Sequence, residues 1–441
     1  MKLRASPHGA LSGRASVPGD KSISHRALLL AALAVGESRI EGLLEGEDVM
    51  ATAATLRRLG VPVARHDGGS WTVAGVGVSG LAEPDTVLDL GNAGTGARLV
   101  MGLLAGHPFT AVVTGDSSLR RRPMGRVAAP LREMGATVLA REGDRLPLAV
   151  RGRADLLPLD WRSEVASAQV KSAILLAGLH AAGRTSVTEP LASRDHTERM
   201  LRAMGAEIAE EETEDGHRVT ITGQPELRPR DFVVPGDPSS AAFPVVAAVL
   251  AEGSRIEIPG VGVNPLRAGL YRTLREMGAR ITETRPREQG GEPVADLVVE
   301  SSDLEAVEVP AERAPRMIDE YPILAVAAAR ARGVTAMRGL GELRVKESDR
   351  FAAILEGLAA CGVRCWSEGD DLFVEGAAGP PPGGGRVAAR LDHRIAMSFL
   401  VLGGIARAPV TVEGAETIAT SFPGFVALMN ALGARIEEAG S

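Results

Sequence analysis

Aromatic side chains are scarce in this chain of 441 residues, where Phe, Trp and Tyr together account for 3%. Proteins that bind single-stranded nucleic acid use such rings to stack against bases, and the formal net charge of −7 also disfavours a nucleic-acid partner. We therefore expect no nucleic acid to bind. If the ligands are anions, the basic side chains that bind them must be gathered locally in a cleft.

Cysteines and long apolar runs are also few. The two cysteines, Cys361 and Cys365, cannot complete a tetrahedral zinc site alone, and nothing marks either as a nucleophile. No apolar run approaches the roughly 20 residues of a membrane span, and residues 1–6 lack the apolar core of a signal peptide. We expect no metal, no membrane segment and a cytoplasmic location.

The remaining composition is that of a soluble globular protein, with 45% hydrophobic and 24% charged residues. The length suffices for two or three domains, each with its own core. A helix-ending signature, such as Leu-Arg-Glu-Met-Gly at residues 131–135, recurs along the chain. Its glycines, expected at the helix C′ position, are Gly60, Gly135, Gly205, Gly278, Gly362 and Gly433.

These signatures belong to a repeated unit. Two alternating strands follow five of them, for example at residues 137–140 and 145–150, and a further helix and strand usually precede them, for example at 93–104 and 110–114. The unit is therefore β-α-β-α-β-β, six times, three per half. Because one unit cannot bury its helices alone, we expect three to pack around one helical core, which makes the fold class α/β with two domains.

The last unit ends after one possible strand, and residues 2–5 can supply the missing one. One domain is then discontinuous, residues 1–19 with 236–441, and residues 20–235 form an inserted domain. We expect the active site in the cleft between them. Residues 285–293 and 379–385 are rich in loop-forming or polar residues and are predicted to be flexible loops.

The turn at residues 17–26, Val-Pro-Gly-Asp-Lys-Ser-Ile-Ser-His-Arg, precedes an apolar helix predicted at 27–35. It brings Lys21, Ser22 and Arg26 to a helix N-terminus, where free N–H groups and the helix dipole favour anions. The alternative is a solvated turn with ordinary surface charges. A second copy, Val-Pro-Gly-Asp-Pro-Ser-Ser at 234–240, has proline in place of Lys21 and no counterpart of Arg26, so the fold does not need the basic residues. This comparison favours a binding role.

Other helix starts carry polar residues at equivalent ends of their units. They are Gly-Asn-Ala-Gly-Thr at 91–95, the arginines at 120–122 before Pro123, Ser-Ala-Gln at 167–169 and Arg194. Taken singly, glycines are more often packing devices and arginines solvated. In the second half acids stand beside bases: Asp319, Glu347 between Lys346 and Arg350, and Asp-His-Arg at 392–394. Lys346 and Arg350, four apart, are predicted to face one side of a helix. A carboxylate among cations is a candidate proton carrier, and a charged helix face is the alternative.

Together these motifs resemble the 5-enolpyruvylshikimate-3-phosphate synthase family, in its order and over nearly the whole chain. The resemblance implies a two-domain inside-out α/β barrel, the enolpyruvyl transferase fold. It also implies transfer of the enolpyruvyl group of phosphoenolpyruvate to the 5-hydroxyl of shikimate 3-phosphate, by addition and then elimination of phosphate. No metal or organic cofactor is expected, and the protein is expected to be a monomer.

The resemblance also implies site residues. Those for shikimate 3-phosphate are Lys21, Ser22, Arg26, Ser167, Ala168, Gln169, Arg194, Asp319 and Lys346. Those for phosphoenolpyruvate are Lys21, Gly94, Arg122, Gln169, Arg350 and Arg394. Of the catalytic residues, Asp319 takes the 5-hydroxyl proton, Glu347 gives a proton to the methylene carbon and later removes one, and Lys21 assists the leaving phosphate.

Three positions depart from the commonest family pattern: Thr420 for lysine, Glu342 for asparagine and Arg194 for serine. With Ser-Ala-Gln at 167–169 they resemble the subset called class II. In the family the herbicide glyphosate occupies the phosphoenolpyruvate site, and alanine at the position of Gly94 marks many tolerant members. Gly94 therefore predicts at best partial tolerance.

Three alternatives remain. UDP-N-acetylglucosamine enolpyruvyl transferase shares the fold, but a cysteine expected within residues 116–124 is absent. An RNA 3′-phosphate cyclase uses related units, but the acidic balance disfavours it. A non-catalytic anion-binding repeat protein has no need of Asp319 and Glu347 beside the basic cluster.

Overall fold

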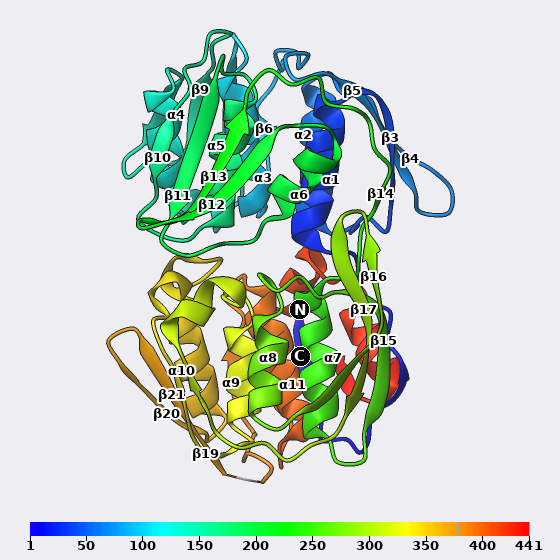
Figure 1. Cartoon of the computed structure of the whole chain (residues 1–441). Coiled ribbons are helices and arrows are strands. Elements are labelled where there is room, and N and C mark those ends of the chain that lie inside the picture. Colours follow the sequence, from blue (N-terminus) through cyan, green and yellow to red (C-terminus); the bar gives the residue numbers. More distant parts are fainter. Residues whose placement is uncertain (378, 441) are drawn as a thin grey trace. The chain divides into compact units, whose positions relative to one another are not determined.

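The computed structural model describes residues 1–377 and 379–440, and the chain divides into two units (Figure 1). The discontinuous unit comprises Met1–Pro18, Pro235–Glu288 and the residues from Pro293 on. The inserted unit comprises Gly19–Val234 together with Gln289–Glu292, a short segment that the sequence analysis assigned to the other domain.

Each unit contains three four-stranded sheets built to one plan. Those of the inserted unit are, in spatial order, β14 (Phe232–Val233), β3 (Val35–Glu41), β5 (Trp71–Val76) and β4 (Val63–Arg65); β6 (Leu88–Asp89), β7 (Thr110–Thr114), β9 (Arg145–Arg151) and β8 (Thr137–Arg141); β10 (Asp160–Arg162), β11 (Arg184–Glu189), β13 (Gly216–Thr222) and β12 (Ile208–Thr213). The first two strands are parallel and the others antiparallel, as a β-α-β-α-β-β unit requires.

The discontinuous unit repeats this plan with strands from both ends of the chain. Its sheets are β16 (Arg280–Gln289), β17 (Glu292–Glu300), β15 (Arg255–Gly262) and β2 (Ser12–Arg14); β18 (Glu308–Val309), β19 (Arg332–Met337), β21 (Asp371–Ala377) and β20 (Arg364–Glu368); β22 (Arg386–Ala388), β23 (Val410–Glu413), β1 (Lys2–Ala5) and β24 (Ile436–Glu438). Strand β1 pairs with both β23 and β24, which confirms the prediction for residues 2–5.

Helices fill the inside of each unit and the sheets lie outside them (Figure 1). The central helices are α1 (Lys21–Leu33), α3 (Gly94–Ala105) and α5 (Ala168–Gly178) in the inserted unit, and α7 (Pro238–Leu250), α9 (Tyr321–Ala328) and α11 (His393–Ile405) in the discontinuous one. The outer helices are α2 (Glu47–Arg58), α4 (Gly125–Glu133), α6 (His196–Ala203), α8 (Gly269–Glu276), α10 (Arg350–Ala360) and α12 (Phe425–Leu432). Every residue of α7, α9 and α11 is buried, as expected for helices that are apolar all round. The predicted inside-out α/β barrel is confirmed.

Short 3₁₀ helices complete the connections: η1 (Leu119–Arg121), η2 (Ala311–Arg316), η3 (Gly341–Val345) and η4 (Ala415–Thr420). All six glycines of the helix-ending signature have positive φ, between +71° at Gly362 and +112° at Gly433. This left-handed backbone is the reason for glycine at the C′ position, and the prediction is confirmed.

The predicted flexible loop at residues 285–293 is wrong, because β16 and β17 extend through it as a long hairpin. Arg287 Nη1 pairs across the hairpin with Asp296 Oδ1 at 3.0 Å, and Glu292 is buried. The polar composition of this segment is typical of a loop, but here charged residues of the two strands form ion pairs across a hairpin. Residues 379–385, by contrast, contain no helix, and their one strand-like feature is a bridge from Gly383 to Ala408.

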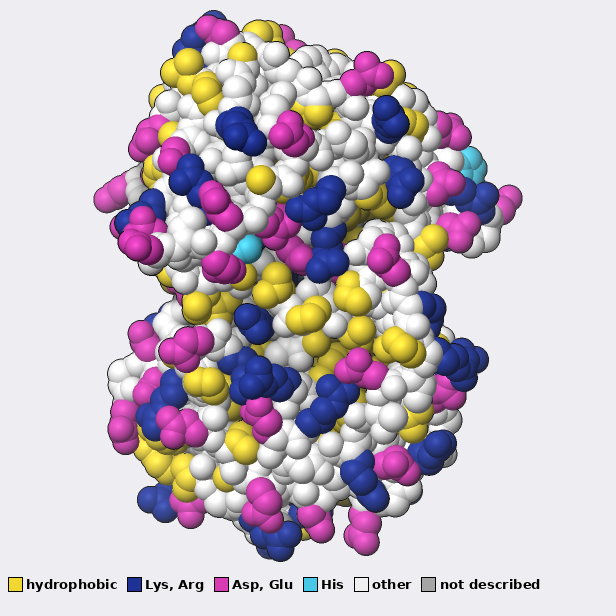
Figure 2. Space-filling model, in the orientation of Figure 1, with side chains coloured by type: hydrophobic (Ala, Val, Ile, Leu, Met, Phe, Trp, Pro, Cys, Tyr) yellow, Lys and Arg dark blue, Asp and Glu magenta, His cyan; other side chains and the backbone are white. Residues whose placement is uncertain are grey.

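Among the described residues no helix combines the length and the apolar character that crossing a membrane requires. On the face shown in Figure 2, basic and acidic side chains are interspersed over both units. Both cysteines are free thiols, and burial raises the pKa of Cys361 to about 11, which keeps that thiol protonated.

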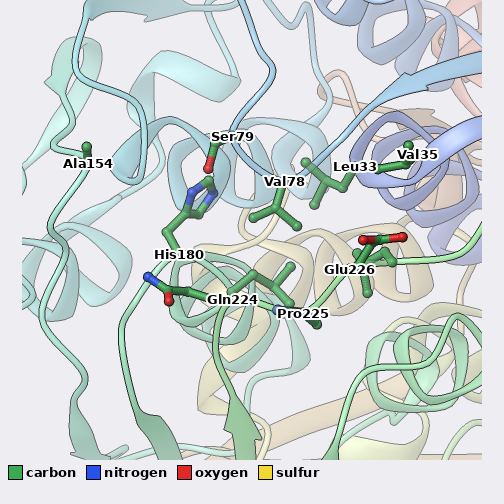
Figure 3. A pocket seen from close by; sticks show the side chains of 11 residues that line it. Leu33, Val35, Val78, Ser79, Ala154, His180, Gln224, Pro225 and Glu226 are labelled. Atoms are coloured by element: carbon green, nitrogen blue, oxygen red, sulfur yellow. The ribbon is translucent and has the colours of Figure 1, made fainter.

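A cavity of about 380 Å³ lies at the C-terminal ends of α1 and α5, lined by Leu33, Val78, Gln224 and Glu226 among others (Figure 3). His180 is another lining residue, 4% exposed, and neither of its ring nitrogens has a hydrogen-bond partner in the described structure. Since α1 is about 20 Å long at 1.5 Å per residue, the cavity is distant from Lys21 at the other end of this helix.

The acid stability of the inserted unit should depend on His180. Burial, helped by nearby His107, lowers the pKa of His180 to about 3, whereas the unfolded chain protonates this histidine near 6.5. Below pH 6.5 the unfolded state therefore binds a proton that the native state does not. As the pH is lowered, this difference decreases the free energy of unfolding by up to about 1.4 kcal/mol per pH unit. We measure the free energy of unfolding by urea denaturation between about pH 4 and pH 6. In His180→Gln we expect it to depend less steeply on pH, because the contribution of His180 is gone. The exposed His66→Gln serves as the control; equal slopes in both variants contradict the assignment.

Candidate active site

Helix α1 begins at Lys21, six residues earlier than predicted, because Asp20 caps it. The Asp20 carboxylate accepts a hydrogen bond from the Ile23 N–H at 2.9 Å. Lys21 is therefore the first helical residue, at the positive end of the helix dipole. Its ammonium lies 2.9 Å from Asp48 Oδ2 on α2. The prediction that Lys21 lies at a helix N-terminus is confirmed.

Arg26 is one turn further along α1 and only 2% exposed. Its Nε donates to Thr197 Oγ1 on α6 (2.7 Å) and its Nη2 to Ser172 Oγ on α5 (2.8 Å). Burial lowers the pKa of Arg26 to about 10, while Glu198 and Asp20 act in the opposite direction and Arg194 lowers it further. Arg26 thus connects three helices, and Arg194 is close enough for its charge to lower the pKa of Arg26.

The amide of Gln169 joins α5 to α3. Its Nε2 donates to Thr95 Oγ1 at 2.8 Å, and its Oε1 accepts from Arg98 Nη1 at 2.8 Å. Arg98 also donates to the Pro123 carbonyl at 3.2 Å. Sequence reasoning overlooked Arg98, although its place one turn after Gly94 on the same helix was a usable signal.

Arg122 is the buried member of the arginine triplet, at 6% exposure. Its Nη2 donates to Asn92, just before α3, and to Ser118 Oγ at 3.3 Å. Gly94 lies beside it, because a Cβ built on Gly94 is 2.6 Å from Arg122 Nη1. The structure thus brings the N-terminal ends of the three central helices of the inserted unit together. The candidate residues at or near these ends are Lys21, Ser22, Arg26, Gly94, Arg122, Ser167, Ala168, Gln169 and Arg194.

In the discontinuous unit the candidate acids surround one guanidinium. Arg350 is fully buried, and its Nη1 lies 3.0 Å from Asp319 Oδ1, its Nη2 2.6 Å from Glu347 Oε2 and its Nε 2.7 Å from Asp392 Oδ2. Burial opposes its charge, yet Asp392, Glu347 and Asp319 together raise the pKa of Arg350 well above its ordinary value. The side chains of Asp319 and Glu347 are 16% and 17% exposed, whereas that of Asp392 is enclosed. Two partly exposed carboxylates therefore pair with the two terminal nitrogens of one guanidinium.

The prediction that Lys346 and Arg350 share a helix face is wrong. Asp349 caps α10 by accepting from the Ala352 N–H at 2.9 Å, so Arg350 is the first helical residue and Lys346 precedes the helix. Arg394 is the second residue of α11, after His393, and its Nη1 donates to the Asp319 carbonyl at 3.3 Å. Thr420, where many family members carry lysine, donates to the Thr417 carbonyl at 2.8 Å.

One group of the described residues could offer three ligand atoms to a metal ion: Asp195, His196 and Glu292, whose ligand atoms lie within 4.8 Å of one another. His196 Nδ1 lies 2.7 Å from Glu292 Oε1, and Asp195 Oδ2 lies 2.6 Å from Arg199 Nε. A guanidinium already compensates the aspartate charge, so these contacts favour an ion-paired cluster over a metal centre.

The fold of the two units is shared by solved structures of enolpyruvyl transferases. The enolpyruvyl transferase NikO from Streptomyces tendae has the same fold, with a TM-score of 0.79 over 100% of this chain and 99% of its own at 21% identity. The EPSP synthase from Acinetobacter baumannii is more similar, at 43% identity and a TM-score of 0.87 with full coverage of both chains.

The family model of EPSP synthase (3-phosphoshikimate 1-carboxyvinyltransferase) matches residues 5–429. A protein of Parvibaculum lavamentivorans with the name 3-phosphoshikimate 1-carboxyvinyltransferase is 63% identical over 98% of this chain and 96% of its own. One of Paramagnetospirillum magneticum with the same name is 63% identical over 98% and 97%. The chain belongs to the EPSP synthase family, which confirms the resemblance inferred from its motifs.

Proposed function

We propose that this chain catalyses the reaction of its family and uses the residues described above to do so: the enolpyruvyl group of phosphoenolpyruvate is transferred to the 5-hydroxyl of shikimate 3-phosphate, and phosphate is released. The observation that carries the assignment of roles is the Asp319–Arg350–Glu347 arrangement, two partly exposed carboxylates on one buried cation. A non-catalytic anion-binding protein gains nothing from it.

Shikimate 3-phosphate and phosphoenolpyruvate are both anions, and the helix N-termini of the inserted unit suit them. Lys21, Ser22, Arg26, Ser167, Ala168, Gln169 and Arg194 bind shikimate 3-phosphate with Asp319 and Lys346. Lys21, Gly94, Arg122 and Gln169 bind phosphoenolpyruvate with Arg350 and Arg394. The protein acts as a cytoplasmic monomer.

The chemistry follows from the enol phosphate group of phosphoenolpyruvate. Its C2 is attacked only as the C3 methylene is protonated, so Glu347 gives its proton to C3 while Asp319 takes the proton of the 5-hydroxyl and the new O–C2 bond forms. In the tetrahedral ketal the C2–O bond to phosphate then breaks, Glu347 removes a proton from the C3 methyl, and the double bond returns. The proton that Asp319 took from the 5-hydroxyl leaves with the phosphate, so both carboxyl groups return to their starting states. The Lys21 ammonium stabilises the charge that develops on the departing bridging oxygen.

The direct test is a coupled assay of phosphate released from phosphoenolpyruvate with shikimate 3-phosphate. Release that depends on both substrates supports the proposal. Release with UDP-N-acetylglucosamine as the acceptor, and none with shikimate 3-phosphate, contradicts it.

Because its ligands come from both units, shikimate 3-phosphate should draw them together and exclude water before the ketal forms. We expect the radius of gyration from small-angle scattering to fall when the substrate saturates the protein. Inorganic phosphate at the same concentration is the control. An unchanged radius at saturation would count against closure.

Gly94→Ala should weaken glyphosate more than phosphoenolpyruvate. The added methyl meets the guanidinium of Arg122 at 2.6 Å and that of Arg98 at 3.1 Å, so both arginines must shift. The methyl meets only the far ends of these two side chains, which can move aside, but it takes up space beside them, and the resemblance implies that glyphosate is longer than the substrate and is crowded first. We expect the inhibition constant to rise about tenfold or more and the KM for phosphoenolpyruvate to rise less. Gly9→Ala, whose Cβ has nothing within 4 Å, is the matched control; equal rises in both constants would mean that the methyl only damages a shared site.

A further inference from the structure

Lys171 stands out in the core of the inserted unit, because α5 is otherwise apolar at its centre and the chain has only four lysines. Its side chain is 1% exposed, and its ammonium lies 3.0 Å from Glu189 Oε2, 2.8 Å from Glu198 Oε1 and 3.3 Å from the Ser193 carbonyl. Burial opposes the charge, but Glu198 and Glu189 outweigh it and raise the pKa of Lys171. These three charged residues come from α5, β11 and α6.

Glu189 connects this cluster to two segments of the proposed substrate site. Its Oε1 accepts from the Ser167 N–H at 2.6 Å, and its Oε2 accepts from Ser193 Oγ at 2.6 Å. Ser167 is the residue before α5, and Ser193 immediately precedes Arg194. The ammonium of Lys171 therefore fixes the carboxylate that holds both segments, and it binds the second of them directly.

The cluster also borders Arg26. Ser172, next to Lys171, and Thr197, next to Glu198, hydrogen-bond to each other at 2.7 Å, and both accept from Arg26. Among the charges near Arg26, that of Glu198 does most to counter the loss of charge that burial promotes. Three proposed ligands of shikimate 3-phosphate, namely Ser167, Arg194 and Arg26, are thus arranged around one buried lysine.

We propose that Lys171 is a positioning residue for shikimate 3-phosphate and acts through its two ion-pair partners, Glu189 and Glu198. This inference rests on the proposed roles of Ser167, Arg194 and Arg26. A buried ion cluster is a poor source of stability, since apolar residues of the same volume often replace one at no loss. A compact ammonium can instead contact a carbonyl and two carboxylates that come from different segments, an arrangement that a planar guanidinium does not match.

The test uses the full chain with Lys171→Met/Glu198→Gln, which removes one charge of each sign, and with Lys2→Met as the control, since Lys2 pairs with Glu413 on the surface of the other unit. We expect the Kd for shikimate 3-phosphate, from calorimetry without phosphoenolpyruvate, to rise about tenfold or more. The KM for phosphoenolpyruvate at saturating shikimate 3-phosphate should stay within about twofold. A Kd within twofold of wild type, or equal losses for both substrates, overturns the proposal.

If the double variant does not fold, Ser193→Ala decides the matter, because it removes one donor to Glu189 and leaves all three charges paired. We then expect a Kd about threefold weaker with an unchanged KM for phosphoenolpyruvate, and an unchanged Kd overturns the proposal. Wild type is measured first: if it neither binds shikimate 3-phosphate nor releases phosphate, the proposed function fails. If it does both, only the role of Lys171 is at issue.

Discussion

Glu347→Gln should lower kcat by about 100-fold or more, because general acid–base catalysis contributes about 10²–10⁴-fold and an amide can neither donate the proton to C3 nor remove it later. The amide oxygen can still accept from Arg350 Nη2, which now lies 2.6 Å from Glu347 Oε2. The site should therefore keep its shape, and the KM for each substrate should change little. Steady-state kinetics with a phosphate-release assay measures both quantities.

The matched control is Glu356→Gln, the same change at an exposed acid that pairs with Arg390 on the surface of the same unit. Its kcat should equal that of wild type, since exposed ion pairs contribute about 1 kcal/mol at most. More than about a tenth of wild-type kcat in Glu347→Gln would show that this carboxylate is not the proton carrier.

Asp319→Asn should cause a loss of similar size at a different point of the reaction. Asparagine keeps an oxygen to accept from Arg350 Nη1, 3.0 Å away in the wild type, but it cannot take the proton of the 5-hydroxyl. We expect kcat to fall about 100-fold or more with the Kd for shikimate 3-phosphate within about threefold. Calorimetry gives the Kd independently of turnover, so a binding defect and a chemical defect are separated.

Two further variants interpret that result. Asp370→Asn changes a surface acid that lies 3.2 Å from Arg344 and should leave kcat unchanged. Asp392→Asn removes the third carboxylate on Arg350, which is enclosed and also caps α11. It should lower the unfolding temperature, because a buried cation loses a partner. Near-normal turnover in Asp319→Asn would leave Asp319 with no catalytic role.

The fold could be predicted from sequence largely because its signals are local. Gly60 and its five counterparts each end a helix by their own backbone conformation, and the apolar runs of α1, α7 and α11 identify the central helices. The helix starts were harder. The capping residues Asp20 and Asp349 determine where α1 and α10 begin. In the sequence each stands among other charged residues, which conceals its capping role.

The site could be predicted only residue by residue. Motifs and family resemblance selected Lys21, Asp319 and Glu347 as candidates, but they did not predict the contacts that hold these side chains. Arg350 joins acids that stand 31 and 42 positions away in the chain, and such pairing has no periodicity to reveal it. Lys171 gave one signal, a lone charge in an apolar helix, but its partners Glu189 and Glu198 could not be paired with it from sequence.

The placement of β1 and β2 has a consequence for protein synthesis. These strands leave the ribosome before the other strands described here, yet β2 must wait for β15, and β1 must wait for β23 and β24, about 400 residues later. At about 5–20 residues per second, β1 remains without its partners for roughly 20–90 seconds. The inserted unit closes its first sheet as soon as β14 emerges, so it can complete its own sheets during translation. The sheets of the inserted unit can thus be complete while β1 is still an exposed strand without partners. An exposed strand edge can pair with other chains, so a ribosome-associated chaperone that binds it would prevent such pairing.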